Sequence, residues 1–301
     1  MACTNYELEE LRLKYESLQT EWDSQQEHLG RLQGDMYKLR NQLQHQSQFC
    51  ASLGAVMGNL IWKASRIPQV VDMLLSGNKV GEFLNIVNGT LMSFMETYDS
   101  QMPGQCADES QFIMAMCGIV TNIAASPAGR QFLVMSPNGK ELLESFVNIL
   151  PSVPCPTGNC LKRLLLMALY NISINQYGLA FLQEQKDILP AISQSLQYDS
   201  TVELRLMSLR LLQSITYEIP TQQLLEEILE NVSMDTVEEM CSTGDGETKA
   251  VAQEILDNIE RARQKFGVSN AGRCQKTVPF NRCYFVQTAE KAQACKGKKS
   301  F

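Results

Sequence analysis

Two stretches of this chain match each other at an offset of 49 residues. Asn122 and Gly129 in the first stretch correspond to Asn171 and Gly178 in the second, and the apolar residues around them match as well. A third copy follows after a further 43 residues, where Ser214 takes the place of the asparagine. Units of this length, each with a long helix, a break and shorter helices, are typical of armadillo arrays, which bury their core between neighbouring repeats. The period therefore predicts an all-α armadillo-type repeat domain.

The helices of this domain are predicted from apolar residues at helical spacing and from the breaks between them. Proline marks several breaks, for example Ser126-Pro127 and Ile219-Pro220. No segment alternates apolar and polar residues as a half-buried strand does, so we expect no sheet. The armadillo-like domain is assigned to residues 49–265, with helices expected at 49–64, 67–75, 79–100, 108–126, 128–135, 139–150, 159–175, 177–184, 187–197, 200–217, 221–231, 233–242 and 245–265.

An unbroken heptad repeat covers residues 4–60. Of its sixteen a and d positions, only Gln25 and Gln46 are plainly polar, and such residues can set the register or oligomer number. A single helix with this stripe has no core of its own, so we expect it to pair with another chain as a coiled coil. A helix folded back onto its own domain is the alternative. Residues 1–48 are assigned as an oligomerisation helix, and its expected contacts are Leu11, Leu18, Leu29, Leu32 and Leu39.

Charge is distributed unevenly along the chain. The net charge is −7, and residues 267–301 carry +6, which leaves −13 for the rest. The tail, assigned to 266–301, is basic and aperiodic and is expected to be disordered. Its charge could attract nucleic acid or acidic lipid, but it contains no recognised module, so we expect neither nucleic acid nor a membrane as a partner. No secretory or bilayer-spanning apolar run is present, which predicts a cytosolic or nuclear protein.

Asn122 and Asn171 are polar residues at matching positions of apolar helices. The third helix of an armadillo repeat lines the inner groove, where an asparagine amide can offer a donor and an acceptor to an extended peptide backbone. Asn175 lies one turn from Asn171 and shares that face. The alternative is that these side chains cap or bond within their own helix bundle. Arg130 could bind a carboxylate or carbonyl group of such a peptide, or could be a solvated arginine on an exposed turn.

No residue pattern in the chain is typical of catalysis. A glycine-rich phosphate loop and a nucleophile elbow are both missing from the sequence. Cys155 and Cys160 flank a loop, but the two histidines, His28 and His45, lie in the heptad helix, so a zinc site lacks ligands. We therefore expect a protein that is not an enzyme and that uses no cofactor and no metal.

Longer blocks around the repeats carry a resemblance to a known family. They comprise residues 108–112, 118–125, 129–134 and 169–175, and they occur in this order. Together they resemble the heat shock factor 2-binding proteins, also known as meiotic localisers of the breast cancer type 2 susceptibility protein. The resemblance covers roughly residues 36–263.

This resemblance implies a non-enzymatic adaptor in meiotic homologous recombination. Members of the family oligomerise through a coiled coil and hold a segment of a recombination mediator, the breast cancer type 2 susceptibility protein, in the armadillo groove. They bring this mediator to meiotic double-strand breaks. The groove residues of the family stand here at Asn122, Arg130 and Asn171.

The resemblance also implies further partners and a location. A meiotic partner protein is expected on the N-terminal helix, and the protein is expected in the nucleus on meiotic chromosomes and also in the cytoplasm. The alternative function is a coiled-coil regulator that binds and sequesters a heat shock transcription factor, heat shock factor 2, because such factors trimerise through heptads themselves.

Overall fold

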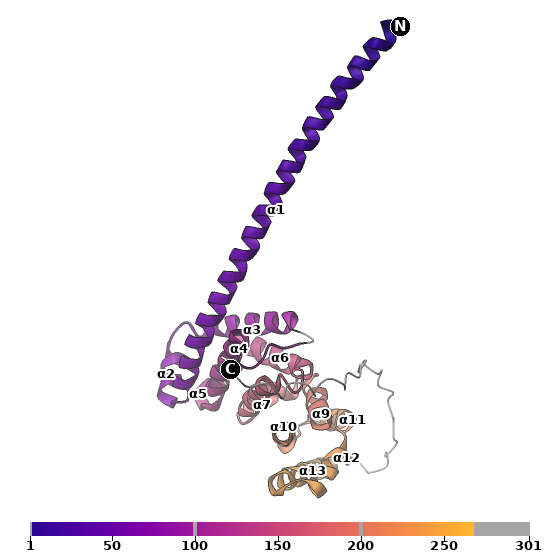
Figure 1. Ribbon diagram of the computed structural model, residues 1–301. Helices are drawn as coiled ribbons and strands as arrows, with labels where there is room; N and C mark the ends of the chain where they lie inside the picture. The colour runs from indigo at the N-terminus through magenta and orange to yellow at the C-terminus, as the bar shows by residue number, and fades with distance from the viewer. Residues whose placement is uncertain (1, 99–100, 199–200, 268–301) are drawn as a thin grey trace, which may run out of the picture. The chain divides into compact units, whose positions relative to one another are not determined.

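The structure is a computed structural model that describes residues 2–98, 101–198 and 201–267, with side chains from residue 6 onwards. These residues form thirteen α-helices and a short 3-10 helix, and none of them forms a strand (Figure 1). The predicted all-α, armadillo-type fold is confirmed. The predicted basic tail lies outside the described residues, apart from positions 266 and 267.

The first helix, α1 (Ala2–Ala64), runs without interruption through the boundary assigned at 48/49 (Figure 1). Residues 6–50 are exposed except for the half-buried Asn41, and the five leucines expected in the oligomer contact are 47–71% exposed. Beyond that point burial follows the helical period, with Ala55, Gly58 and Ser65 buried. The same helix is therefore solvated at its start and part of the repeat body at its end.

The other helices follow in four units of three, and the first helix of each unit (α2, α5, α8 and α11) is short. Their ends differ from the predicted ones by at most three residues. They are α2 (Pro68–Ser76), α3 (Val80–Thr97), α4 (Asp108–Ala125), α5 (Pro127–Met135), α6 (Pro137–Ile149), η1 (Leu150–Ser152), α7 (Asn159–Ser173), α8 (Gln176–Gln183), α9 (Ile188–Tyr198), α10 (Val202–Tyr217), α11 (Gln222–Asn231), α12 (Met234–Thr243) and α13 (Gly246–Phe266).

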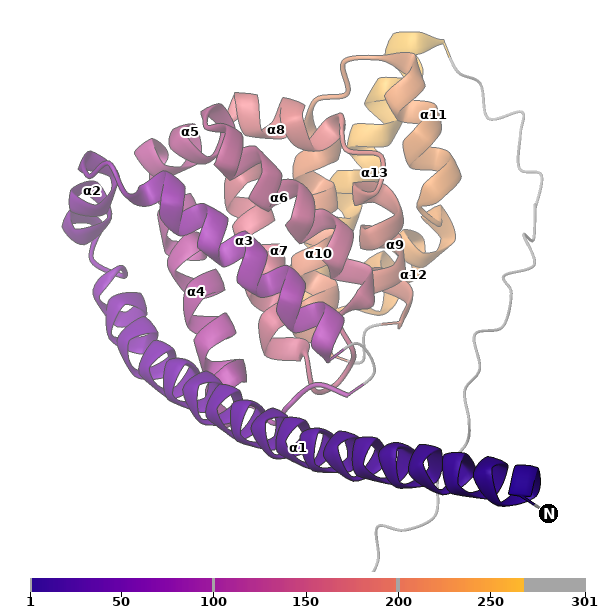
Figure 2. The ribbon, with the colours of Figure 1, turned by 90° about the horizontal axis from the view of Figure 1, so that it is seen from above.

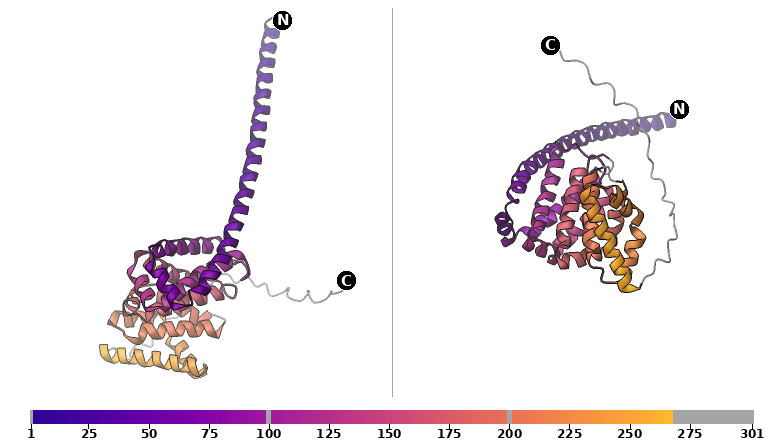
Figure 3. Two further views of the ribbon diagram at one scale, coloured as in Figure 1. Left: turned by 90° about the vertical axis from the view of Figure 1, so that its left-hand side faces the viewer. Right: turned by 90° about the horizontal axis from the view of Figure 1, so that it is seen from below.

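The third helices of successive units stack on one another. The end of α1 packs on α4, α4 on α7, α7 on α10 and α10 on α13. We call these five segments the third-helix layer. The second helices α3, α6 and α9 follow each other beside it (Figure 2). The views in Figure 3 show the same progression of helices from α1 to α13 across the repeat body.

Two of the corners between units, from α4 to α5 and from α7 to α8, require glycine. The chain bends by 109° from α4 to α5 and by 118° from α7 to α8. A Cβ on Gly129 would lie 2.0 Å from the carbonyl oxygen of Ile123, and one on Gly178 would lie 2.2 Å from that of Ile172. No side chain fits at these distances, which explains why both glycines recur with the repeat period.

Small residues also bring α1 close to α4. A Cβ on Gly54 would lie 2.8 Å from the ring of Phe112. In the opposite direction, Gly118 of α4 leaves room for the indole of Trp62, because a Cβ there would lie 2.1 Å from a ring atom. These contacts fix the end of α1 as the first member of the third-helix layer.

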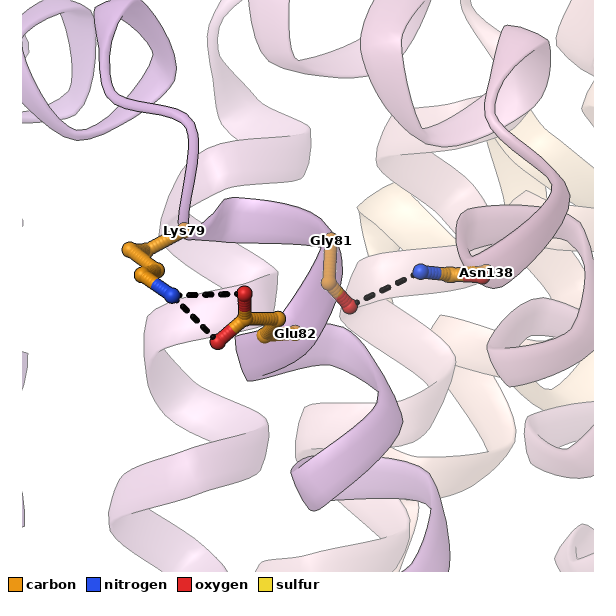
Figure 4. A network of polar contacts seen from close by, with 4 residues as sticks. All are labelled: Lys79, Gly81, Glu82 and Asn138. Carbon is orange, nitrogen blue, oxygen red and sulfur yellow. Dashed lines mark hydrogen bonds and ion pairs between the residues drawn. The ribbon is translucent and has the colours of Figure 1, made fainter.

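Polar contacts join the second helices α3 and α6 at their N-terminal ends (Figure 4). The amide nitrogen of Asn138 donates to the carbonyl oxygen of Gly81 at 3.0 Å. On the exposed side of the same turn, the ammonium group of Lys79 lies 2.6 and 2.9 Å from the two carboxylate oxygens of Glu82. Because this ion pair is solvated and lies within α3 and the residue before it, it stabilises the domain little. The bond from Asn138 is the contact of this group that links α3 to α6.

Candidate functional site

Asn122 joins the end of α4 to the end of α1. Its Nδ2 atom lies 2.8 Å from the hydroxyl oxygen of Ser65 and 3.3 Å from the carbonyl oxygen of Trp62, so the amide donates to both. The side chain is half-buried. Its Oδ1 atom accepts no hydrogen bond from the described residues, and one acceptor therefore stays open.

Asn171 repeats this arrangement one unit later. Its Nδ2 atom donates to the carbonyl oxygen of Thr121 at 3.4 Å, and its Oδ1 atom likewise has no donor among the described residues. In the third copy the hydroxyl oxygens of Ser173 and Ser214 lie 2.7 Å apart and join α7 to α10. Each recurring polar residue thus bonds towards the preceding third helix, because a polar group between packed helices needs a partner.

Arg130 lies in the first turn of α5 and caps the end of α4. Its Nη1 atom donates to the carbonyl oxygens of Ala125 at 2.9 Å and Ala124 at 3.4 Å. A cation is favourable at a helix C-terminus, where the last carbonyl groups have no partner within the helix. The side chain is half-buried, and its Nη2 and Nε atoms have no acceptor among the described residues. These donors can still fork onto a carbonyl or carboxylate group.

Asn175 is the N-cap of α8. Its Oδ1 atom accepts hydrogen bonds from the backbone of Tyr177 at 2.9 Å and Gly178 at 3.2 Å. Ser126 occupies the same repeat position and caps α5 in the same way. Asn175 therefore has a structural role that its place in the repeat already specifies.

Contacts between these segments bring the four predicted residues to the corners where α4 turns into α5 and α7 into α8. Asn171 bonds to the residue that precedes Asn122. The Nδ2 atom of Asn175 lies 3.4 Å from the side chain of the residue that follows Arg130. The corners offer open acceptors on the two third helices and open donors on Arg130.

Asn175→Ala should lower the stability of the domain, because α8 loses its capping oxygen. We expect a loss of about 1 kcal/mol, the usual cost of removing such a cap. Thermal unfolding followed by circular dichroism measures it, with Asn175→Asp as the matched control, since aspartate keeps the capping oxygen. Equal melting temperatures for Asn175→Ala and wild type would contradict the capping role.

Exposed apolar and aromatic side chains lie at the ends of α7 and α10 and at the start of α8, near the predicted residues. Ile174, Tyr177 and Tyr217 are 55%, 60% and 68% exposed. The two tyrosines were not predicted from the sequence. A signal for Tyr217 was present, because it follows Ile174 by 43 residues, the same offset that separates Ser214 from Asn171. The surface around the corners is thus apolar and aromatic as well as polar.

Two arginines on the third helices form ion pairs within the domain. The Nη1 atom of Arg163 in α7 lies 3.0 Å from a carboxylate oxygen of Glu203 in α10. Arg210 in α10 forms the equivalent ion pair with Glu247 in α13. Since Arg163 and Arg210 are each paired with a glutamate of the next third helix, these two arginines do not by themselves favour an acidic ligand.

The described residues hold no group of three or more metal-ligating side chains. Burial raises the pKa of the Cys117 thiol to about 12, so this thiol stays protonated and is a poor nucleophile. Within the described ranges no single helix is long and apolar enough to cross a membrane, although the bent pairs α4–α5 and α7–α8 pass that test together.

The stacked three-helix units and the polar residues that recur between them define an armadillo-type repeat protein of a non-catalytic, binding kind. Residues 51–177 and 186–264 match the profile of the heat shock factor 2-binding protein ARM-like domain. The chain belongs to the heat shock factor 2-binding protein family.

A relative and two solved structures illustrate these similarities. The chain is 33% identical over 263 residues to the heat shock factor 2-binding protein of Mus musculus. The aligned region covers 84% of this chain and 76% of the mouse protein. A designed armadillo repeat protein is 14% identical with a TM-score of 0.41, over 70% of this chain and 92% of its own. An engineered protein is 12% identical with a TM-score of 0.43, over 71% of this chain and 92% of its own. At these scores the fold assignment rests on the family match and on the helices themselves.

Proposed function

We propose that this chain is a non-enzymatic adaptor in meiotic homologous recombination. Its third-helix layer binds an extended segment of a recombination mediator, the breast cancer type 2 susceptibility protein, and localises the mediator to meiotic double-strand breaks. The adaptor acts in the nucleus on meiotic chromosomes and is also present in the cytoplasm. The observation that carries the proposal is the pair of open amide oxygens on Asn122 and Asn171, in a family of binding proteins.

The spacing of the two open acceptors suits an extended chain. Packed helices lie about 8–10 Å apart, and three residues of extended peptide span roughly 10 Å. The oxygens of Asn122 and Asn171, on neighbouring helices, can therefore accept backbone N–H groups of one bound strand. Arg130 supplies donors for a carbonyl or carboxylate group of the same strand, and Ile174 offers it apolar contact.

A calorimetric titration tests this proposal. The full-length chain is titrated with overlapping fragments of the mediator, and we expect one fragment to bind tightly. Asn171→Ala should weaken that binding, because an acceptor is lost, while the melting temperature reports separately on the hydrogen bond to Thr121. If no fragment bound, the mediator would not be the ligand of this surface.

The proposed adaptor also self-associates through the heptad stripe of α1. The leucines of the stripe are exposed in the single chain, and a soluble helix with such a stripe gains stability by pairing. Self-association presents several armadillo domains at once, which raises avidity for a ligand that carries repeated binding segments.

Leu18→Asp combined with Leu32→Asp should reduce the oligomer to smaller species, because the substitutions place charges at d positions of the heptad stripe, which form the seam between the paired helices. The armadillo domain should keep its melting temperature, since both leucines are exposed in the single chain. Light scattering measures the mass. The matched control is Tyr6→Asp with Leu13→Asp, two exposed residues on the opposite side of the helix, and it should leave the mass unchanged. Equal masses for both double variants would refute the coiled coil.

A second candidate function is the binding and sequestration of heat shock factor 2. The observations that favour it are the name of the mouse relative, which describes a protein that binds this factor, and the exposed heptads of α1. Pull-down of heat shock factor 2 by two variants separates this function from the binding of the mediator. They are the seam variant, Leu18→Asp with Leu32→Asp, and the layer variant Asn171→Ala. If only the seam variant lost heat shock factor 2, the factor would bind to α1, and the third-helix layer would be left for another ligand.

A further inference from the structure

The sequence contains two Ser-Pro pairs, Ser126-Pro127 and Ser136-Pro137, and no Thr-Pro pair. Each pair begins a motif of serine, proline, one variable residue, glycine and a basic residue, which is Arg130 in the first copy and Lys140 in the second. Each serine is the N-cap of the helix that follows, α5 or α6, and its Oγ atom accepts a hydrogen bond from the glycine of its own motif. A serine before proline is the minimal element that proline-directed protein kinases recognise.

We propose that Ser126 is phosphorylated by a kinase of this class, and that the phosphate binds the guanidinium group of Arg130 and so closes the ligand surface at the corner between α4 and α5. In the transfer, the hydroxyl oxygen of Ser126 forms a bond to the γ-phosphorus of ATP. The bond from that phosphorus to the oxygen bridging to the β-phosphate breaks, and ADP leaves. The hydroxyl proton passes to the catalytic aspartate of the kinase. Closure of the surface rests on the proposed function, whereas the modification and its contact with Arg130 do not.

A kinase can reach Ser126 at the surface of this corner. Ser126 is half-buried, and its neighbours Ala125, Pro127 and Ala128 are exposed. The backbone at Ser126 is extended, with φ −89° and ψ 145°, because proline disfavours the helical region for the residue before it. Substrate peptides lie in kinase clefts with an extended backbone at the acceptor serine, so this serine already has that conformation.

The guanidinium group of Arg130 is held beside Ser126. The backbone nitrogen of Arg130 donates to the carbonyl oxygen of Ser126 at 3.0 Å. Its Nη1 atom donates to the carbonyl oxygen of Ala125, the residue before Ser126, at 2.9 Å. Its Nη2 and Nε atoms have no acceptor among the described residues. A phosphate adds three strong acceptor oxygens and nearly two negative charges, and arginine binds such a group through paired, charge-assisted hydrogen bonds.

The hydrogen bonds of the Ser126 hydroxyl show why the phosphate needs this arginine. The hydroxyl oxygen accepts from the backbone nitrogen of Gly129 at 2.9 Å, and the hydroxyl group donates to the carbonyl oxygen of Ile123 at 3.2 Å. A phosphate dianion can keep the first bond as an acceptor, but it has no proton to donate to Ile123. Its charge beside that carbonyl oxygen needs a cation, and the open donors of Arg130 supply one.

The equivalent corner of the next unit lacks both partners. Asn175 occupies the place of Ser126, and Leu179 occupies the place of Arg130. Asn175 still caps α8, so a turn of this kind requires a capping side chain but neither a hydroxyl group nor a cation. Serine and arginine thus occur together at the corner that offers open donors to the proposed ligand, and repeat geometry alone does not account for them.

Phosphorylation in vitro tests the modification. The full-length chain is incubated with ATP and a mitogen-activated protein kinase or, separately, a cyclin-dependent kinase, and phosphopeptides are identified by mass spectrometry. We expect phosphate on Ser126 in the wild type. Ser126→Asn is the control, because asparagine keeps a capping oxygen and accepts no phosphate. If neither kinase placed phosphate on Ser126 after prolonged treatment, the modification would be refuted.

Phosphorus NMR tests the contact with Arg130 without any mediator. In the Ser136→Asn background, the signal of the phosphate on Ser126 reports its second pKa, which is about 6 in the absence of neighbours. A guanidinium group stabilises the dianion and lowers this pKa, so Arg130→Gln should raise it. The matched control is the phosphate on Ser136 in the Ser126→Asn background, whose pKa should not respond to Arg130→Gln. An equal pKa at Ser126 with and without Arg130 would overturn the contact.

Calorimetry against the binding fragment of the mediator tests the closure. Phosphate on Ser126 should weaken binding at least about tenfold, because it occupies the donors of Arg130 and adds like charge beside a carbonyl or carboxylate group of the ligand. Phosphate on Ser136, at the corner between α5 and α6 outside the third-helix layer, should leave the affinity unchanged. The melting temperature of each phosphorylated chain shows whether the domain stays folded.

The outcomes separate this inference from the proposed function. Unchanged affinity with phosphate on Ser126, or an equal loss with phosphate on Ser136, would overturn the closure. If no fragment bound even the unmodified chain, the proposed function would fail, and the phosphorus titration would still decide whether the phosphate on Ser126 binds Arg130.

Discussion

Gly129→Ala should destabilise the armadillo domain by roughly 3 kcal/mol, the upper part of the range for overpacking. The new Cβ would lie 2.0 Å from the carbonyl oxygen of Ile123. Backbone atoms of two helices would have to separate to admit it, because the clash involves the main chain and not the end of a flexible side chain. Gly178→Ala should behave alike, since its Cβ would lie 2.2 Å from the carbonyl oxygen of Ile172. Chemical denaturation with circular dichroism measures both.

Gly89→Ala is the matched control, with an expected effect of opposite sign. Gly89 is exposed in the middle of α3, and a Cβ there meets nothing within 4 Å. The substitution should stabilise the protein by up to about 1 kcal/mol through helix propensity. If Gly129→Ala were as stable as Gly89→Ala, the corner between α4 and α5 would not depend on glycine.

Arg130→Glu should weaken binding of the mediator segment at least about 100-fold, or roughly 3 kcal/mol. The substitution removes the open guanidinium donors and places a carboxylate beside the last carbonyl oxygens of α4, which are its present acceptors. Both changes disfavour a carbonyl or carboxylate group of a bound peptide. Calorimetry against the binding fragment measures the effect.

Lys140→Glu is the charge-matched control for this variant. Lys140 is exposed on α6, outside the third-helix layer, and its reversal changes the net charge by the same amount. It should leave the affinity unchanged. The melting temperature of Arg130→Glu shows how much of its effect comes from the lost cap on α4. Retained affinity in Arg130→Glu would remove this residue from the site.

Helices and corners could be predicted from the sequence because their causes are local. Apolar spacing specifies a helix within a few turns, and proline or glycine ends it nearby. The 49-residue offset then identified matching positions, among them Asn122 with Asn171 and Gly129 with Gly178. Their recurrence indicated a shared role, and the structure shows that the glycines share one at the corners.

The details of the site depend on residues far away in the chain. Asn122 bonds to Ser65, 57 positions earlier, and Arg163 pairs with Glu203, 40 positions later. No local pattern specifies such partners, so the sequence could not distinguish an open amide from a bonded one. Asn175 illustrates the same point, because its amide oxygen proves to be engaged by the backbone of α8.

The sequence by itself determined that this chain is an all-α repeat protein, which positions recur, and that the stripe of α1 is apolar, since these follow from periodicity along one chain. The tertiary structure decided which atoms of the recurring residues remain free and which face of α1 stays uncovered. The physical reason is that each third helix completes its hydrogen bonds and its packing on the preceding one. What is left for a ligand or a second copy is therefore set by the stacking of the repeats.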